Sequence, residues 1–187
     1  MKHLRFQLLL VLVTAVMFLA ALWANEQLFR RFEYVEGINW VYLPAGIRLL
    51  STLLFAEAGA VGLLLVSSGV AYFYMFPNDH VRALMGGVLA SAAPYGVYLV
   101  AQRWMGLRRS LNNLTPARLL LCALAYSIAS PLLHHIWFYL HGDTRHLADG
   151  FVAMFVGDLV GTLIVLYTGK GVLAIHAWWT ARTPVPA

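Results

Sequence analysis

The sequence predicts an all-α fold, a polytopic transmembrane helical bundle of about six helices with both termini in the cytoplasm. The 187 residues are 61% hydrophobic and only 11% charged, whereas soluble domains carry about 25% charged residues. The mean hydropathy of +0.73 is correspondingly high. Apolar runs follow one another along the chain, and about 20 apolar residues form a helix that crosses a bilayer. The lipid bilayer is therefore the expected solvent for most of the chain.

The whole chain, 1–187, is expected to form a single transmembrane domain. No stretch between the apolar runs has the length of a separate soluble kinase, cyclase or hydrolase domain. The sequence contains no nucleotide-binding loop and no Gly-x-Ser-x-Gly element, so we predict that the protein is not an enzyme. The formal net charge is +5, but the basic residues gather in short loops, which argues against nucleic acid as a partner.

The first predicted helix covers about 6–24. A signal peptide is the alternative, because a short basic start precedes the apolar run. The run is long for a signal peptide, however, and Leu22–Trp23–Ala24 is a poor cleavage site. Residues 25–38 are polar and of mixed charge, which is typical of an external loop or an interfacial helix.

Residues 39–76 are predicted to form a helical hairpin with arms at about 39–56 and 57–76. The stretch is almost wholly apolar. As one helix it would be about 57 Å long, far more than the roughly 30 Å of a bilayer core. The expected break is Glu57–Ala58–Gly59. Arg48 lies inside the first arm and indicates a polar interior, because an intramembrane charge faces protein rather than lipid.

Three more helices are predicted at about 81–104, 116–140 and 147–168. Thr115–Pro116 is a typical helix start, since threonine caps the free N–H groups and proline suits the first helical position. Gly169–Lys170–Gly171 either ends the last helix or loosens it before an interfacial segment at 172–179.

The distribution of basic residues orients the bundle. Eight of them fall on the side that holds both termini, against four on the other side. Positive charge concentrates on the cytoplasmic side, so the pattern predicts a multi-pass protein of the bacterial inner membrane. The densest cluster lies in loop 103–118. We expect this loop to contact another membrane or cytoplasmic signalling protein, with anionic lipid as the alternative partner.

Arg48 and Asp158 are the two charges placed well inside predicted helices. Each lies nine residues after the expected outer start of its helix, at Asn39 and Asp149, so both are about 13 Å deep by helical rise. We predict that they meet as a buried ion pair that joins the two helices. The pair either only staples the helices or also takes part in sensing or transport.

Five of the seven histidines fall on the expected outer side. These are His80, His134, His135, His141 and His146. Histidine and carboxylate clusters bind zinc, copper or nickel, and a haem between His80 and His134 or His135 is a further alternative. The sequence shows no recognised metal-binding spacing, so histidines that are simply tolerated at the interface are the plain alternative. A cluster with pKa values near about 6.5 would also report periplasmic pH.

Two stretches carry a family resemblance. Residues 40–47, WVYLPAGI, precede an apolar hairpin, and residues 156–161 read VGDLVG. The first resembles the tryptophan–proline–x–x–glycine-like opening of the MASE1 family, and the second resembles its glycine–aspartate–x–x–glycine element. Gly157 and Gly161 also form a small-xxx-small face for close helix packing. The positions that match the family are Pro44, Gly46, Gly157, Asp158 and Gly161, and Trp40 belongs to the first motif in a stretched spacing.

The resemblance implies an integral-membrane sensory domain, of the kind usually found before bacterial histidine kinases or diguanylate cyclases. Three departures stand beside it. Three residues separate Trp40 from Pro44, the family usually has about eight helices, and the 187 residues contain no output domain. Arg48 has no assignment in the family pattern.

These observations predict a non-enzymatic, sensor-like or accessory membrane module that acts through a separate partner protein. One alternative is a small transporter or channel subunit that uses Arg48 and Asp158 in an inner pathway. The other is a membrane protein that binds a transition metal or haem through the outer histidines.

Overall fold

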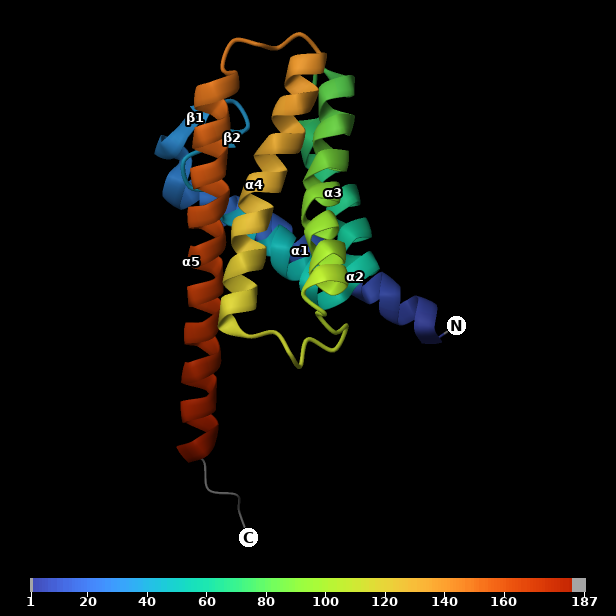
Figure 1. Cartoon of the computed structure of the whole chain (residues 1–187), viewed down its shortest axis with the longest axis vertical. Coiled ribbons are helices and arrows are strands. Elements are labelled where there is room, and N and C mark those ends of the chain that lie inside the picture. The colour runs from blue at the N-terminus through green and yellow to red at the C-terminus, as the bar shows by residue number, and fades with distance from the viewer. Residues whose placement is uncertain (1, 183–187) are drawn as a thin grey trace.

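The computed structural model describes residues 2–182 and shows a mostly helical bundle (Figure 1). Met1 and residues 183–187 of the predicted domain lie outside the described residues. The five long helices are α1 (Lys2–Phe29), α2 (Leu43–Val70), α3 (His80–Trp104), α4 (Pro116–Leu140) and α5 (Leu147–Arg182). All five are long and apolar enough to cross a membrane. The chain is therefore a multi-pass membrane protein with an all-α bundle, as predicted.

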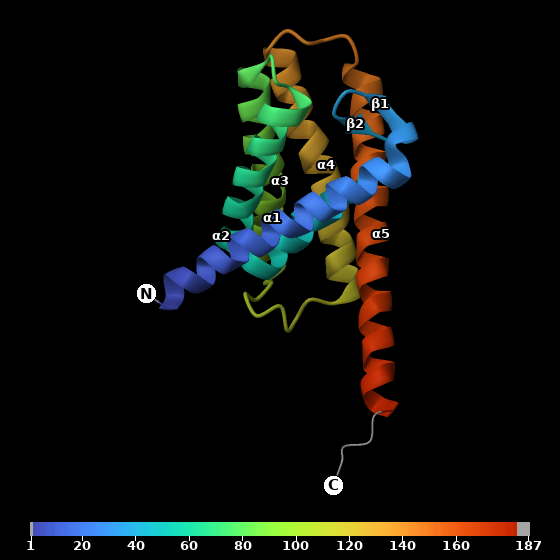
Figure 2. The same cartoon turned by 180° about the vertical axis from the view of Figure 1, so that it is seen from behind.

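Helix α1 crosses the bundle obliquely (Figure 2). It is longer than the predicted 6–24 and continues to Phe29, where the 3-10 turn η1 (Arg30–Phe32) follows. The helix packs closely on α2, because a Cβ added to Gly62 would lie 2.8 Å from Cβ of Thr14. Much of its remaining surface is apolar and exposed, as expected for a helix that faces lipid.

A short antiparallel hairpin, β1 (Glu33–Val35) and β2 (Ile38–Asn39), connects α1 to α2. The expectation of an external loop or interfacial helix over 25–38 did not include it. Its turn contains Gly37 at a φ of 84°, in the left-handed region that favours glycine. The chain then enters the bundle in extended form, and the Tyr42 amide donates to the Gly157 carbonyl of α5 at 3.1 Å.

Helix α2 begins at Leu43, so the predicted helix start at Asn39 is wrong. The Asn25 side chain accepts a hydrogen bond from the Leu43 amide at 2.8 Å, which satisfies one of the free N–H groups at a helix start. Pro44 occupies the first turn, where its missing N–H costs nothing. The local cause of the late start is thus a capping contact from α1, which no pattern inside 39–56 reveals.

The predicted helical hairpin is present, with its break at Ala56 rather than at residues 57–59. Ala56 has a φ of 49° and a ψ of −120° inside an otherwise helical stretch. A Cβ added to Gly59 would overlap the carbonyl oxygen of Ser51, although these residues would be about 12 Å apart along a straight helix. The chain therefore folds back into a first arm, 43–55, and a second arm, 57–70.

The second arm ends in the π-helical turn η2 (Ala71–Met75), and α3 then returns beside it. Asp79 caps α3 by accepting from the Arg82 amide. Thr115 caps α4 by accepting from the Arg118 amide at 3.3 Å, which confirms the predicted start at 115–116.

Helix α5 runs without interruption to Arg182, so the predicted end at 168 is wrong, as is a separate interfacial segment at 172–179. Gly169 and Gly171 have open space around them, and a glycine without a turn or a clash does not stop a helix. Residues 167–180 are exposed, and this part of α5 extends beyond the other helices (Figure 1).

The bundle has two unlike ends. The hairpin end carries β1, β2 and the start of α5, and the basic-loop end carries the Ala56 turn and residues 105–115. An apolar core fills the bundle toward the basic-loop end. Its buried members come from the first arm, α3, the loop and α4, and include Leu49, Leu53, Val97, Leu107 and Tyr126.

Close contact between the extended entry segment and α5 predicts a strong effect of adding one methyl group at Gly161. A Cβ there would overlap the Tyr42 carbonyl oxygen, which is backbone and cannot turn aside. We expect Gly161→Ala to lower the free energy of unfolding by about 1–3 kcal/mol, the usual cost of overpacking. The measurement is chemical unfolding of the purified protein in detergent.

Gly169→Ala is the matched control, because it lies on the same helix in open space and should cause no loss. Equal stability of the two variants would contradict the close crossing.

Candidate functional site

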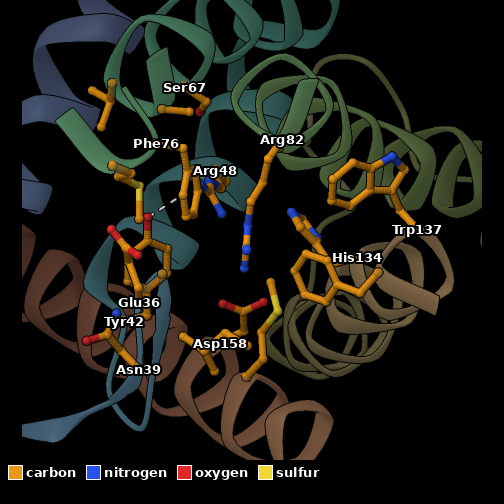
Figure 3. A pocket seen from close by; sticks show the side chains of 18 of the residues that line it. Glu36, Asn39, Tyr42, Arg48, Ser67, Phe76, Arg82, His134, Trp137 and Asp158 are labelled. Atoms are coloured by element: carbon orange, nitrogen blue, oxygen red, sulfur yellow. Dashed lines mark hydrogen bonds between the residues drawn. The ribbon is translucent and has the colours of Figure 1, made fainter. Parts of the chain in front are cut away.

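A buried cavity of about 70 Å³ opens toward the hairpin end (Figure 3). All five helices and the β-hairpin contribute to its wall. The polar and charged side chains that line it are Glu36, Asn39, Tyr42, Arg48, Ser67, Arg82, His134 and Asp158. Figure 3 shows Arg48, Arg82, His134 and Asp158 directed toward a common central space. Charged groups at this depth are costly in a membrane protein and mark a functional site by default.

Arg48 lies on the first arm and is 8% exposed. Its guanidinium lies between two aromatic rings, 5.3 Å from the Phe18 centroid and 5.2 Å from the Tyr42 centroid. Helical side chains point back toward the helix start, which brings Nη2 within 3.4 Å of the Tyr42 hydroxyl. Nε has no hydrogen-bond partner. The charge is therefore held by the ring faces and by one long hydrogen bond.

Asp158 lies on α5 and is 1% exposed. It sits between Gly157 and Gly161, where the entry segment crosses α5 in close contact. Its Oδ2 has no hydrogen-bond partner. Arg48 and Ser130 are the groups that act on its carboxylate. This anion is thus buried with part of its hydrogen-bonding capacity unused.

The predicted direct ion pair between Arg48 and Asp158 is wrong. No nitrogen–oxygen distance between these two described side chains is 4.0 Å or less. The depth argument counted from Asn39, but the helix begins at Leu43, and the aromatic rings of Phe18 and Tyr42 take the guanidinium instead. The two charges nevertheless line the same cavity and act on each other across it.

Arg82, at the mouth of the cavity, was placed among the outer loop charges by sequence reasoning. Its guanidinium lies 4.6 Å from the Phe76 ring centroid and 5.4 Å from that of Phe138. It also forms a partly exposed ion pair with Asp143 at 3.4 Å. Its Nε has no partner. The helix predicted at about 81–104 includes this residue, but the sequence gave no signal for the cavity.

Several neutral polar side chains of the bundle are also buried without a hydrogen-bond partner. In the described part of the chain they include Ser67, which lines the cavity, and Tyr126, Ser130 and Thr162, which lie outside its wall. Most buried polar atoms in proteins are paired with protein or with ordered water. A concentration of unpaired ones beside two buried charges indicates a place built for water or for a polar ligand.

The outer histidines form no metal-binding group in the described part of the chain, and the haem alternative stays a prediction. Within the described residues, no group of three or more His, Cys, Asp or Glu side chains is arranged to hold a metal ion. His80 stacks on Tyr72, His141 stacks on Trp137, and His146 contacts Tyr34 edge to face. His134 and His135 are each tied through Nδ1 to a backbone carbonyl of α4 at 2.8 Å. Each of the five side chains is thus engaged with an aromatic ring or a backbone carbonyl.

The motif residues meet at one place, where the start of α2 crosses α5. A Cβ added to Gly46 would lie 2.6 Å from Cβ of Val165. Gly157 and Gly161 admit the carbonyl groups of Asn39 and Tyr42 in the same way. The Trp40 backbone also reaches Gly157 at this contact, but the residue is 38% exposed and its ring packs edge to face on Tyr34.

No protein family model, no curated protein and no solved structure matches the chain. The resemblance of the two motifs to the MASE1 family stays a prediction.

The position of Arg48 between two rings predicts that Phe18 contributes through the charge as well as through packing. We expect Phe18→Leu to lower stability by about 1–3 kcal/mol, because a cation–π contact and ring volume are both lost. Thermal and chemical unfolding in detergent measures the loss. Repeating the change in an Arg48→Met background should show a smaller loss, by about 0.5–2 kcal/mol.

Phe6→Leu is the control, since Phe6 lies on the exposed surface of the same helix. Identical losses for Phe18→Leu with and without Arg48 would show that the guanidinium contributes nothing through this ring.

Proposed function

We propose that the chain is a non-enzymatic, sensor-like membrane module. It receives a small polar signal molecule in the cavity and passes the change to a separate partner protein at the basic-loop end. The observation that carries the proposal is the first arm of α2. Its Arg48 lies in the cavity wall, and its far end reaches Ala56, next to the basic loop.

The cavity favours reception of a ligand over its passage through the protein. It reaches inward from Glu36 and Arg82 at the hairpin end. Between it and the basic-loop end lies the apolar core of Leu49, Leu53 and their neighbours. A polar solute would have to cross this packed layer to leave on the other side, so the arrangement supports a site with one entrance.

The first arm is the mechanical link between the two ends. Its 13 residues span about 20 Å by helical rise. Beyond the turn, Glu57 forms an ion pair with Arg109 of the basic loop at 2.9 Å. Ala56 is held in a backbone conformation that is rare for a residue with a side chain, and such residues often mark switch regions. A shift of the arm at Arg48 therefore bears directly on the loop.

The basic loop is ordered enough to present a defined surface. The Asn113 side chain accepts from the Arg108 amide at 3.0 Å and donates to the Gly106 carbonyl at 2.8 Å. Leu107 is buried in the core, while Arg103, Trp104 and Arg108 are exposed. An exposed aromatic ring among cations suits an acidic protein partner, with anionic lipid as the competing one.

The predicted placement in a bacterial inner membrane belongs to the same proposal. The two arms of α2 and the four other long helices make six passes along the bundle. Both described ends of the chain therefore lie at the basic-loop end (Figure 2). That end holds Arg103, Arg108, Arg109, Arg118 and Lys170. The excess of positive charge supports a cytoplasmic basic loop, and the MASE1 resemblance supports a bacterial sensory module.

A small transporter or channel subunit is the second candidate function. The specific observation in its favour is the broken α2, preceded by an extended segment that enters the bundle, since discontinuous helices line substrate sites in many transporters. Solute counterflow in vesicles decides between the two, because a receptor with one entrance supports binding without flux.

Capture of the partner tests the main proposal. Tagged full chain is cross-linked in its native host and purified from membranes. We expect a protein partner whose recovery falls at least fivefold with Arg103→Gln/Arg108→Gln, because the loop loses two exposed charges. Arg30→Gln/Arg31→Gln is the matched control, with two exposed arginines at the hairpin end, and should leave recovery unchanged. Recovery of this chain alone, or equal loss in both variants, would argue against the proposal.

The orientation gives a separate prediction. In a Cys122→Ala background, Asn112→Cys places a thiol on the basic loop and Thr144→Cys places one in the loop between α4 and α5. A membrane-impermeant thiol reagent added to intact spheroplasts should label Thr144→Cys only. Labelling of Asn112→Cys in intact spheroplasts would reverse the assignment of the two faces.

A further inference from the structure

We propose that the cavity binds a small zwitterion, an α-amino acid between glycine and serine in size, with its carboxylate on Arg48 and its ammonium group on Asp158. The inference deepens the proposed function and rests on the cavity being the place where a ligand is received. It follows from the charges that line the cavity, the unpaired atoms on them and the space between them.

Arg48 provides half of the recognition. A guanidinium stays charged in proteins and offers five N–H donors in a fork that matches a carboxylate. Here one donor makes a single 3.4 Å hydrogen bond to Tyr42, and buried Nε makes none. The two aromatic rings contact the cation without using its donors. A carboxylate in the cavity would satisfy the unused donors and the charge together.

Asp158 provides the other half. It is buried, its Oδ2 lacks a hydrogen-bond partner, and no cation lies within 4.0 Å of it in the described structure. An ammonium group offers three donors to such an oxygen. A simple anion beside Arg48 would add repulsion to Asp158, and a simple cation would add repulsion to Arg48. A ligand that carries both charges relieves both buried groups at once.

The size of the cavity limits the ligand. Its volume is about 70 Å³, and a single water molecule needs roughly 10–15 Å³ of cavity space. The space therefore holds about five to seven non-hydrogen atoms. Glycine has five of these atoms, alanine six and serine seven. Phe18, Phe76 and Phe138 close the sides of the cavity, so a large side chain has no room.

The mouth of the cavity suits the same ligand. Arg82 lies there with its Nε unpaired and directed inward (Figure 3), and exposed Glu36 stands across from it. Arg82, its ion-pair partner Asp143 and Glu36 put charges of both signs at the entrance, so the approach disfavours neither end of a zwitterion. An entrance lined by charges of one sign would instead concentrate simple ions of the opposite sign.

The test is calorimetric titration of the full chain in nanodiscs of zwitterionic lipid. Glycine, alanine and serine are the probes, with acetate and methylamine as the two half-ligands and phenylalanine as the oversized one. We expect binding of the three small amino acids, at least tenfold tighter than binding of acetate or methylamine. Phenylalanine should give no heat of binding.

Three variants locate the site. Arg48→Gln and Asp158→Asn should each weaken glycine binding at least tenfold, whereas Asp149→Asn, an exposed carboxylate on the same helix, should change it less than twofold. Ser67→Leu should abolish binding by filling the cavity while leaving both charges in place. If a charge variant fails to fold, Ser67→Leu still tests the site. The comparison of the probes with one another uses the unmodified chain and needs no variant.

The opposite results are equally definite. Acetate or methylamine bound as tightly as glycine would overturn the zwitterion and leave a ligand-receiving cavity in place. Glycine binding unaffected by Ser67→Leu would overturn both, because the ligand would then bind outside the cavity. No heat with any probe would overturn both the zwitterion and the cavity as the point of reception. Partner capture through the basic loop tests the remainder of the proposed function independently.

Discussion

The close crossing of an extended backbone segment over α5 is the constraint on which the rest of the structure depends. Gly157 and Gly161 let the carbonyl groups of Asn39 and Tyr42 approach the helix more closely than any side chain permits. This contact sets how deep α2 begins, and therefore where Arg48 lies. It also places Asp158, between the two glycines, against the entry segment. Backbone packing in the bundle thus fixes both charges without any direct bond between them.

The sequence predicted the large elements because their signals are local. Apolar runs, short polar loops and the Thr115–Pro116 start specify helices within their own residues, and the hairpin at 39–76 follows from length alone. The exact start of α2 could not be predicted, since it depends on a hydrogen bond that the Leu43 amide donates to Asn25, eighteen residues earlier. The continuity of α5 was missed because Gly169 and Gly171 do not end a helix where no other contact turns the chain.

The sequence identified the two buried charges of the candidate site but not how they are arranged. Intramembrane charge alone picked out Arg48 and Asp158, and the small-xxx-small spacing picked out the surface around Asp158. Their separation could not be predicted, because Phe18 of α1 and Tyr42 of the entry segment compete for the guanidinium. Arg82 and the unpaired hydroxyl group of Ser67 carry no sequence signal, since only the packed bundle brings them to one cavity.

The short first arm has an electrical consequence. Water in the cavity would carry the potential of the hairpin side down to Arg48. The transmembrane voltage then falls mainly over the apolar layer that remains, rather than over the full bilayer of about 30 Å. Moving one unit charge across the full transmembrane voltage changes its free energy by about 2.3 kcal/mol per 100 mV. Arg48 stands at the edge of this thinned barrier, so even a small displacement of its arm moves charge through an intensified field.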